Sequence, residues 1–440
     1  MRSLALSANQ SSGLPLLSSG NLDDAIVPFN VLETRNRDLL KAFAWIFQTD
    51  RIVELRRTIG DWFGVEDIYL APSGECAIAQ ILSLLPQKEV VMPAWICHQV
   101  KTAAKVAGKQ IIFVDLGKNS INATSVEYAE AAKPGRVMLL AHLFGVPTDV
   151  QAICELARSR DCITIEDAVP AIGGRQGGRP LGTFADFGVF SFEQSKRIPA
   201  FRGGFIVANN GKLIERDRLQ SFRVTNSTSR MPLAGLAKAI LQNLITSPWI
   251  YRALTTRLLH LRPAIERALR APRGWKANGV RSRASDERDR PRELEQLPAP
   301  QTPFYTREVH PYQAALALGM IRRLDKIAEK ISKLSGIYSA TLRDSNIATF
   351  LPAGCDTRGL MRFPIAFPGK DRSRILQSAR EHGIHLKVLW SEEIGLEGLP
   401  NSLWVARNLV LLPLYAALPE KSACRLAQVL VEIDKNTPTS

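Results

Sequence analysis

Short apolar runs alternate with amphipathic stretches between residues 67 and 208. The runs have the length of buried strands, and the stretches between them repeat their apolar residues at helical spacing. Strands are expected at 67–71, 89–92, 110–114, 137–140, 162–165, 187–191 and 204–208, and helices at 74–85, 96–107, 124–132 and 148–159. This alternation predicts an α/β fold with a mostly parallel, seven-stranded sheet between helices. Ligands on such sheets bind at the carboxyl ends of the strands.

The pattern changes before and after this region. Residues 1–25 are polar and are expected to form a mobile arm, and the large α/β domain is expected to span 26–229, with helical periodicity at 36–63. Over 230–300, two apolar stripes at helical spacing precede a stretch rich in Arg, Pro and Ser. This segment predicts a helical insertion that ends in a linker.

The remaining third of the chain is predicted to contain a connecting helix and a second domain. The helix is expected at 311–344, within a connecting segment over 301–344, and residues 345–440 are expected to form a smaller α+β domain. Its expected elements are strands at 361–367 and 384–389 and helices at 371–382 and 419–434.

Positive charge is concentrated in the insertion. The chain carries a formal net charge of +15, and residues 230–292 contain 14 Lys and Arg against 4 Asp and Glu. A basic amphipathic helix of this kind can lie on an anionic membrane surface, or it can pack on the protein with a solvated basic face. Both interpretations stay open. Nucleic-acid binding is not expected, because no recognised binding module accompanies the charge.

Neither a membrane span nor a secretory leader is expected. No stretch approaches the roughly 18 consecutive apolar residues that a transmembrane helix needs, and the start of the chain lacks the apolar core of a signal peptide. The six cysteines lie far apart without a CxxC pair, so neither a disulfide framework nor a metal site is expected. These features favour a cytoplasmic location, with the inner face of the membrane as the alternative that the basic insertion allows.

Two short motifs that follow expected strands could bind parts of a cofactor. Ser73-Gly74-Glu75 lies between a strand and a helix, where backbone N–H groups at the helix start can hold a phosphate; a plain helix cap is the alternative. Asp167 ends an apolar strand. A carboxylate there can keep a pyridine nitrogen protonated, or it can cap the following turn.

The third motif contains a lysine. Lys196 lies in the loop after the strand that ends at Ser191, and Gly203-Gly204 behind it allows close backbone approach. A lysine amine in such a loop can form a Schiff base once it loses its proton, which burial near cationic groups favours. An ordinary surface lysine is the alternative.

Taken together, the order and spacing of these motifs resemble the DegT/DnrJ/EryC1/StrS family of sugar aminotransferases. The matching motifs are Ser73-Gly74-Glu75, Val91-Met92-Pro93-Ala94, His142-Leu143-Phe144-Gly145, Glu166-Asp167-Ala168, Phe190-Ser191-Phe192 through Lys196, Gly203-Gly204 through Asn209, Gln313-Ala314-Ala315-Leu316 and Leu411-Leu412-Pro413-Leu414. The resemblance implies the aspartate-aminotransferase fold, known as fold type I, with pyridoxal 5'-phosphate (PLP) as cofactor.

The resemblance also implies a role for each matching residue. Lys196 would bind the cofactor covalently and act as general acid and base, and Asp167 would pair with the pyridine nitrogen. Ser191 and the turn at Ser73, Gly74 and Glu75 would bind the phosphate.

Three positions near the cofactor depart from the family pattern. Glu75 replaces a hydroxyl residue beside the phosphate, and Pro170 replaces a glutamine that contacts the cofactor hydroxyl. Cys97 stands where an aromatic residue usually stacks on the ring. Trp95 or His98 is therefore expected to cover the ring instead.

The expected reaction is transfer of an amino group from an amino acid, glutamate in most family members, to a nucleotide-linked ketosugar. The product would serve polysaccharide, lipopolysaccharide or glycosylated-metabolite biosynthesis. A homodimer is expected; Glu308 lies in a stretch that usually reaches the neighbouring subunit's cofactor phosphate. Two alternatives stay open: another PLP reaction on this fold, such as sugar dehydration or a step on a non-sugar substrate, and a non-catalytic regulatory or membrane-surface protein.

Overall fold

The computed structural model describes residues 27–29, 31–44, 48–220, 233–247, 250–251, 309–391 and 395–439. The expected N-terminal arm, nearly all of the second apolar stripe and the linker therefore lie outside the described residues. No helix in these ranges is both long and apolar enough to cross a bilayer.

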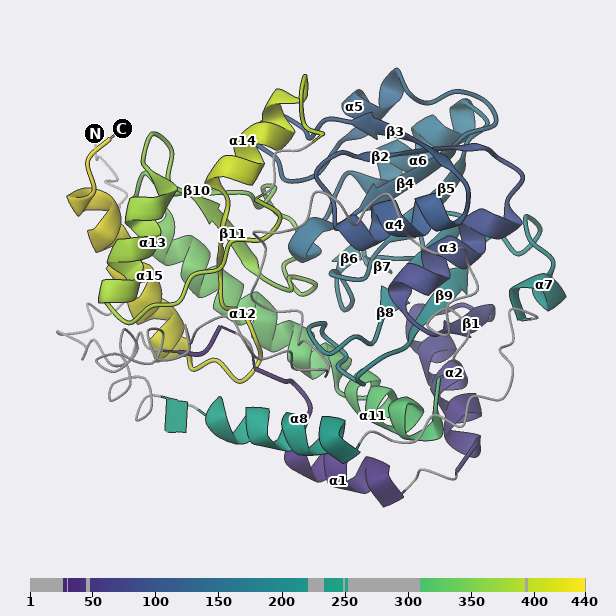
Figure 1. Cartoon of the computed structure of the whole chain (residues 1–440), viewed down its shortest axis with the longest axis horizontal. Coiled ribbons are helices and arrows are strands. Elements are labelled where there is room, and N and C mark those ends of the chain that lie inside the picture. The colour runs from purple at the N-terminus through teal and green to yellow at the C-terminus, as the bar shows by residue number, and fades with distance from the viewer. Residues whose placement is uncertain are drawn as a thin grey trace, which may run out of the picture.

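A seven-stranded sheet forms the centre of the larger lobe (Figure 1). Its strands are β1 (Ile68–Ala71), β2 (Glu89–Pro93), β3 (Gln110–Val114), β4 (Val137–Ala141), β5 (Ile163–Asp167), β8 (Phe187–Ser191) and β9 (Gly204–Ala208). They lie in the order β1-β9-β8-β5-β4-β2-β3. The five strands from β8 to β3 run parallel, and β9 is antiparallel to both of its neighbours. The predicted mostly parallel sheet is confirmed.

Helices cover both faces of this sheet. They are α3 (Gly74–Leu84), α4 (His98–Val106), α5 (Ser125–Ala129) and α6 (Val150–Ser159). Within β4, Leu139 belongs to the core shared with α3 and α4, whereas Leu140 belongs to a separate core shared with α5 and α6. Successive strand residues thus enter different cores, as the two-residue period of a strand requires.

The stretch with helical periodicity at 36–63 and the stretch expected to form one helix at 311–344 each contain two helices. The pattern at 36–63 gives α1 (Asn36–Ala44) and α2 (Asp50–Phe63), and the pattern at 311–344 gives α11 (Pro311–Ile321) and α12 (Leu324–Leu342). The second break lies at Arg323, which leaves helical geometry with φ −109° and ψ 3°. From there α12 runs toward the smaller lobe and packs against its last helix (Figure 1).

The smaller lobe is built on a three-stranded antiparallel sheet. Its elements are β10 (Ala348–Thr349), β11 (Phe363–Ala366), α13 (Arg372–Glu381), α14 (Pro400–Asn408), β12 (Val410–Leu412) and α15 (Glu420–Asn436). The strand expected at 384–389 is wrong. Within that range a single β-bridge joins Lys387 to Leu411, and the chain then turns at Trp390, whose φ is 51°. The domain boundaries at 229, 300 and 344 stay predictions.

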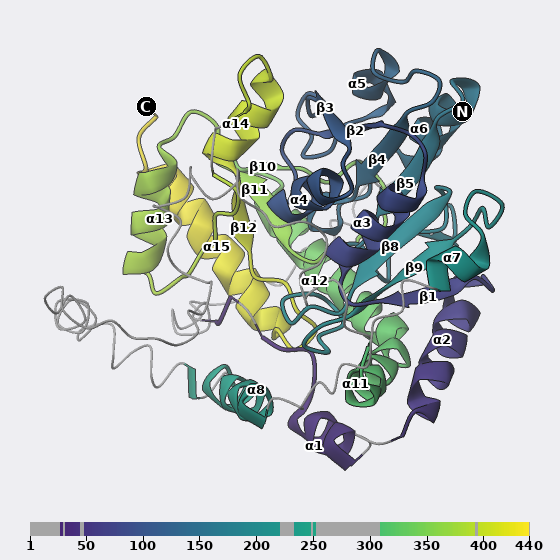
Figure 2. The same cartoon turned by 45° about the vertical axis from the view of Figure 1, so that its right-hand side comes forward.

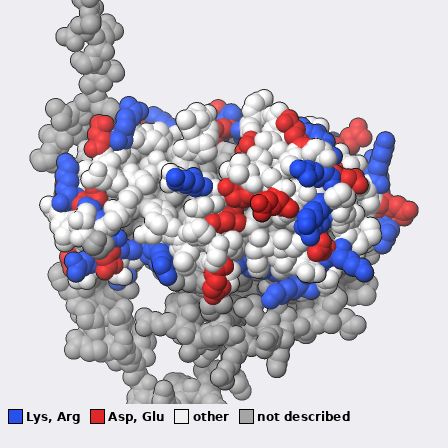
Figure 3. Space-filling view, turned by 90° about the horizontal axis from the view of Figure 1, so that it is seen from above, with Lys and Arg blue, Asp and Glu red and all other residues white. Residues whose placement is uncertain are grey.

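Several further elements complete the described part of the fold. They are η2 (Leu143–Gly145), the hairpin β6 (Arg175–Gln176) and β7 (Arg179–Pro180), α7 (Arg216–Gln220) and α8 (Leu233–Ile245). α8 confirms the first apolar stripe of the insertion as a helix. It lies beside α1 in both cartoon views, and Asn243 Nδ2 donates to Asn36 Oδ1 at 2.8 Å (Figures 1 and 2). On the described part of the face in Figure 3, Lys and Arg are interspersed with Asp and Glu.

A carboxylate of the larger lobe caps a helix of the smaller one. Asp115, directly after β3, accepts hydrogen bonds from the Asn401 N–H at 3.0 Å, the Ser402 N–H at 2.7 Å and the Ser402 hydroxyl at 2.6 Å. These residues form the first turn of α14, whose N–H groups have no partner within the helix. The cap therefore joins the two lobes at the edge of the large sheet.

Candidate active site

Asp167 is the last residue of β5 and is 5% exposed. Ile165 of the same strand faces α3 and α4, so the strand period places Asp167 on that side and Glu166 on the opposite side. Oδ1 of Asp167 accepts a hydrogen bond from the Val169 N–H at 3.2 Å. A buried carboxylate thus lies at the carboxyl edge of the sheet, where parallel sheets bind ligands.

Glu166, one residue earlier, has a different environment. Glu166 and His142 are both fully buried, and His142 Nε2 lies 2.9 Å from Glu166 Oε1. Because His142 Nδ1 accepts the Thr148 N–H, the ring proton is assigned to Nε2, which donates it to Glu166. Three backbone N–H groups of a neighbouring turn also donate to this carboxylate: those of Gly182, Phe184 and Ala185. Glu166 therefore anchors the 182–185 turn, a role that the sequence did not indicate.

Lys196 lies in the loop that follows β8. Two backbone hydrogen bonds close the neck of this loop, from the Phe192 N–H to Gly203 O at 2.7 Å and from the Ala200 N–H to Phe192 O at 2.9 Å. At the tip, the Lys196 N–H donates to Glu193 O at 2.9 Å. The backbone of Lys196 is thereby fixed, while its side chain stays partly exposed.

The charges of Lys196 and Asp167 act on each other and on the Cys97 thiol. Burial raises the pKa of Asp167, and the positive charge of Lys196 opposes that rise. Burial also raises the pKa of the Cys97 thiol; there the charge of Lys196 lowers the pKa and that of Asp167 raises it. Electrostatic effects of this kind fall off with distance, so these mutual effects place the three side chains close together. The structure thus brings the predicted lysine and aspartate to one site.

Three chain segments form a tight cradle near these side chains. Gly74, the first residue of α3, lies so close to Ser191 that a Cβ added to the glycine would be 3.0 Å from Ser191 Cβ. A Cβ added to Gly204 would be 3.0 Å from the Gly74 nitrogen. Ser73 caps α3 by accepting the Cys76 N–H at 3.0 Å. We call Ser73, Gly74, Ser191 and Gly204 the cradle; it presents two hydroxyl groups and a helix N-terminus, a suitable set for a phosphate.

Glu75 and Arg202 set the charge next to the cradle. Burial raises the pKa of Cys76 to about 12; the carboxylate of Glu75 adds to the rise, and the guanidinium of Arg202 opposes it. The carbonyl of Arg202 accepts a hydrogen bond from Gln313 Nε2 at 3.3 Å. A cation therefore stands near the same helix start as the unexpected carboxylate. Sequence reasoning missed Arg202, although its position directly before Gly203 was an available signal.

The residues expected to cover a bound ring lie in different places. Trp95 is 2% exposed, its indole N–H donates to Trp390 O at 2.9 Å, and its ring packs on Phe144 and Trp390. His98 is exposed at the start of α4. Trp95 is thus engaged in an aromatic cluster, whereas Cys97 lies at the space beside Lys196, so the role of Trp95 or His98 in covering the ring stays a prediction. Pro170 is buried, and Glu308 lies outside the described residues.

This donor set fits pyridoxal phosphate. The carbonyl of that cofactor requires an amine, its ring nitrogen a carboxylate, and its phosphate a group of N–H and hydroxyl donors. These groups come from the ends of β5 and β8, the loop after β8, the start of β9 and the turn after β1. The lack of room for a Cβ at Gly74 and Gly204 shows that the cradle requires glycine at these two positions.

Comparison with known proteins identifies similar sequences and similar folds. Residues 37–232 match the model of the DegT/DnrJ/EryC1/StrS aminotransferase family. This part of the chain is similar to the members of that family, and the match spans less than half of the chain. It contains Lys196, Asp167 and the whole cradle.

Single relatives are more distant. GDP-perosamine synthase of Escherichia coli O157:H7 is 35% identical over 130 residues, which are 29% of this chain and 35% of that protein. The matched segments cover less than half the length of the curated relatives.

Solved structures match nearly the whole chain at low identity. NtdA of Bacillus subtilis with bound cofactor PMP is 19% identical, with a TM-score of 0.64 over 94% of this chain and 86% of that one. GDP-4-keto-6-deoxymannose-3-dehydratase (ColD) with bound GDP-perosamine is 15% identical, with a TM-score of 0.66 over 92% of this chain and 100% of that one. The chain has the PLP-dependent transferase fold of type I, as predicted.

Proposed function

We propose that this protein is a PLP-dependent aminotransferase that moves an amino group from an amino acid, with glutamate as the expected donor, to a nucleotide-linked ketosugar. The observation that carries the proposal is the convergence of Lys196, Asp167 and the cradle at the carboxyl edge of the sheet. The family of residues 37–232 and the activity named for the Escherichia coli relative support it. The product would serve polysaccharide, lipopolysaccharide or glycosylated-metabolite biosynthesis.

Each residue has a defined task in this reaction. Bound PLP supplies an electron-withdrawing ring that stabilises negative charge on the carbon next to the reacting nitrogen. Asp167 holds the ring nitrogen protonated, and its buried position strengthens its pairing with that cation. Lys196 holds the cofactor through its Nζ and then carries a proton between the reacting carbons. The hydroxyls of Ser73 and Ser191 and the N-terminus of α3 fix the phosphate.

Borohydride reduction and donor titration test the proposal. The purified protein should be yellow, and borohydride should attach the cofactor covalently to Lys196, as peptide mass spectrometry would locate it. Glutamate alone should convert the spectrum to that of pyridoxamine phosphate, nearer the ultraviolet. The Lys196→Ala variant should lose both signals. The matched control Lys212→Ala, an exposed lysine after β9, should keep both. Full turnover by the Lys196→Ala protein would refute the assignment.

Sugar dehydration is the second candidate. The observation that favours it is Cys97, which lies beside Lys196 at the position of the family's stacking aromatic residue and so changes the surface against the ring. The mass of the product separates the two reactions, because transamination installs an amine whereas dehydration removes water. A deoxy product without nitrogen would replace the first proposal by the second.

A non-catalytic regulatory role is the alternative from another class. It predicts that cells carrying Lys196→Ala keep the phenotype of the wild type. Loss of the cell-surface or metabolite glycan in that strain would exclude it, provided that the variant accumulates to the wild-type level.

We also propose a cytoplasmic homodimer that contacts the inner membrane surface through residues 230–292. Exposed apolar residues on the neighbouring helices α1 and α8 support burial against a second copy: Leu40, Leu241, Leu244 and Ile245. The excess of Lys and Arg in 230–292 supports the membrane contact. Analytical ultracentrifugation tests the dimer, and co-sedimentation with anionic against neutral vesicles tests the membrane contact.

A further inference from the structure

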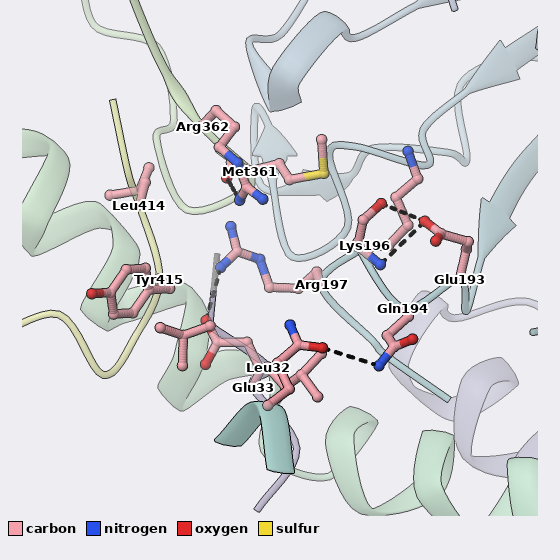
Figure 4. Close-up of a pocket in the computed structure, with 13 residues that line it drawn as sticks. Leu32, Glu33, Glu193, Gln194, Lys196, Arg197, Met361, Arg362, Leu414 and Tyr415 are labelled. Atoms are coloured by element: carbon pink, nitrogen blue, oxygen red, sulfur yellow. Dashed lines mark hydrogen bonds and ion pairs between the residues drawn. The ribbon is translucent and has the colours of Figure 1, made fainter. Parts of the chain in front are cut away.

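The helix α8 lies against the loop that carries Lys196. The match to the family model ends at residue 232 and α8 begins at Leu233, so this helix lies beyond the matched region, at the start of the predicted basic insertion. Gln242 of α8 lines the same pocket of ≈ 200 Å³ as Gln194 and Lys196 of the loop (Figure 4). The insertion therefore begins directly beside the predicted catalytic lysine.

The two sides of α8 have different surroundings. Three apolar residues on one side are exposed: Leu241, Leu244 and Ile245. Successive residues of an α-helix are rotated by about 100°, so Ala239, Gln242 and Asn243 lie on the other side. Ala239 is buried in the main core. The two amide side chains at 242 and 243 thus belong to the side of the helix that faces the protein.

Gln242 contacts the loop directly. Gln194 Nε2 donates to Gln242 Oε1 at 3.5 Å (Figure 4). Gln194 lies two residues before Lys196 in the sequence. A hydrogen bond of this length is weak, so this contact alone would hold the loop only loosely.

Asn243 provides a second, shorter connection through Thr34. Asn243 Nδ2 donates to Thr34 O and to Asn36 Oδ1, each at 2.8 Å. Thr34 is 2% exposed, and its hydroxyl donates to the carbonyl of Pro199 at 3.0 Å. Pro199 lies three residues after Lys196. Hydrogen bonds therefore run from α8 through one buried threonine to the Lys196 loop.

The residue next to Thr34 also holds this loop. Glu33 Oε1 lies 3.5 Å from Nη1 of Arg197, which directly follows Lys196. Arg197 is 4% exposed, so this ion pair is shielded from solvent and its geometry is restricted. Residues 33–34 thus contact the loop at two positions after the lysine, Arg197 and Pro199.

We propose that α8 is a brace for the Lys196 loop, and that Asn243, acting through Thr34, is a positioning residue for the lysine. The inference rests on the proposed aminotransferase function, in which Nζ of Lys196 must reach the cofactor and then the reacting carbons. The position of that amine depends on where the backbone of the loop is held. A displacement of about 1 Å at a reacting group can cost roughly 100-fold in rate, so a support outside the site can matter for the reaction.

Hydrogen–deuterium exchange of peptides that cover residues 193–200 tests the brace, because the Lys196 N–H forms one of the loop's own hydrogen bonds. Exchange is measured on the holoenzyme and on the apoprotein. The test variants are Asn243→Ala and the nearly isosteric Asn243→Asp, which replaces the donor by an acceptor. Asn408→Ala is the matched control, because the Asn408 amide donates within its own helix, α14. Thermal melting checks that each variant is folded.

We expect both Asn243 variants to speed exchange of residues 193–200 about 2- to 10-fold, the range that loss of one hydrogen bond predicts, with no change for Asn408→Ala. Gln242→Ala should have a smaller effect, because its contact is longer. In both Asn243 variants the rate of spectral conversion at saturating glutamate should fall, whereas the half-saturating glutamate concentration should stay the same. Borohydride should still fix the cofactor on Lys196.

A double-mutant cycle with Thr34→Val tests the route. This substitution removes the hydroxyl that bonds Pro199 and keeps the branching of the side chain. If the support passes through Thr34, the double variant with Asn243→Ala should exchange no faster than the faster single variant. Multiplied effects would overturn the route.

Two further outcomes separate the brace from the proposed function. Wild-type exchange of residues 193–200 in folded Asn243→Ala and Asn243→Asp proteins would overturn the brace. Absence of borohydride-fixed cofactor in the wild type would instead contradict the proposed function, and exchange in the apoprotein would still decide whether Asn243 supports the loop.

Discussion

Glu166 and Asp167 are adjacent in sequence, yet the structure predicts opposite effects when each loses its charge. The fully buried Glu166 carboxylate accepts hydrogen bonds from four donors, with Oε1 facing His142 and Gly182 and Oε2 facing Phe184 and Ala185. In a Glu166→Gln variant one of these oxygens becomes an NH₂ group that can only donate. Either orientation of the amide therefore leaves two buried donors without an acceptor.

The expected cost follows from those two donors. Each buried donor without a partner costs about 1–3 kcal/mol, so Glu166→Gln should lower the free energy of unfolding by about 2–6 kcal/mol. That is a large share of the roughly 5–15 kcal/mol that stabilises a typical domain. His142 cannot compensate by moving its proton to Nδ1, because Nδ1 already accepts the Thr148 N–H.

Urea unfolding of the cofactor-free protein measures this loss, and tryptophan fluorescence can follow the transition because Trp95 is buried. Asp167→Asn is the matched control: it should leave the apoprotein stable but remove the activity. A Glu166→Gln protein within about 1 kcal/mol of the wild type, well below the range derived from the two donors, would refute the reasoning. So would an Asp167→Asn protein that unfolds as readily as Glu166→Gln.

Two further predictions concern the cradle and pH. Gly204→Ala would push a Cβ into the backbone oxygen of Phe190 and place it 3.0 Å from the Gly74 nitrogen, so we expect a cost of about 1–3 kcal/mol or more and weaker cofactor retention on dialysis. Gly336→Ala, which has open space in α12, should instead stabilise by about 0.5–1 kcal/mol. Equal stability and equal cofactor retention of the Gly204→Ala and Gly336→Ala variants would contradict the tight backbone contact at Gly204. Burial raises the pKa of Asp167 above its ordinary value of 3.8, so the folded apoprotein favours the protonated, uncharged side chain. The stability that this protonated form contributes is present at low pH and is lost as pH rises through the raised pKa. Asp167→Asn should therefore gain stability over the wild type with rising pH, and a pH-independent difference in urea titrations would count against this effect.

The sequence predicted the large sheet well because its strands are buried and their apolar runs are local signals. It also predicted that Lys196 and Asp167 meet, since β5 and β8 are parallel neighbours whose following loops lie at the same edge. The contact between Arg197 and Glu33 was not predictable in this way. Arg197 and Glu33 are 164 positions apart, and no local pattern reports such a contact.

The predictions that were wrong also failed because the deciding contacts are not visible in the local sequence pattern. The helix expected to run unbroken over 311–344 stops at Arg323, and apolar periodicity continues on both sides of the break without marking it. The strand expected at 384–389 has suitable residues but only one bridging partner. α14 was missed, although Pro400 at its start is a local helix signal, and its cap comes from Asp115, 286 positions away from Asn401.

The cap of α14 also bears on how the two lobes can move relative to each other. Three hydrogen bonds converge on the Asp115 carboxylate, so they pin one edge of the smaller lobe to the sheet. A hinge motion that keeps these three hydrogen bonds is a rotation of the smaller lobe about that edge. Such a rotation would move the residues that precede β11 relative to the Lys196 loop, while the start of α14 stays against the large sheet.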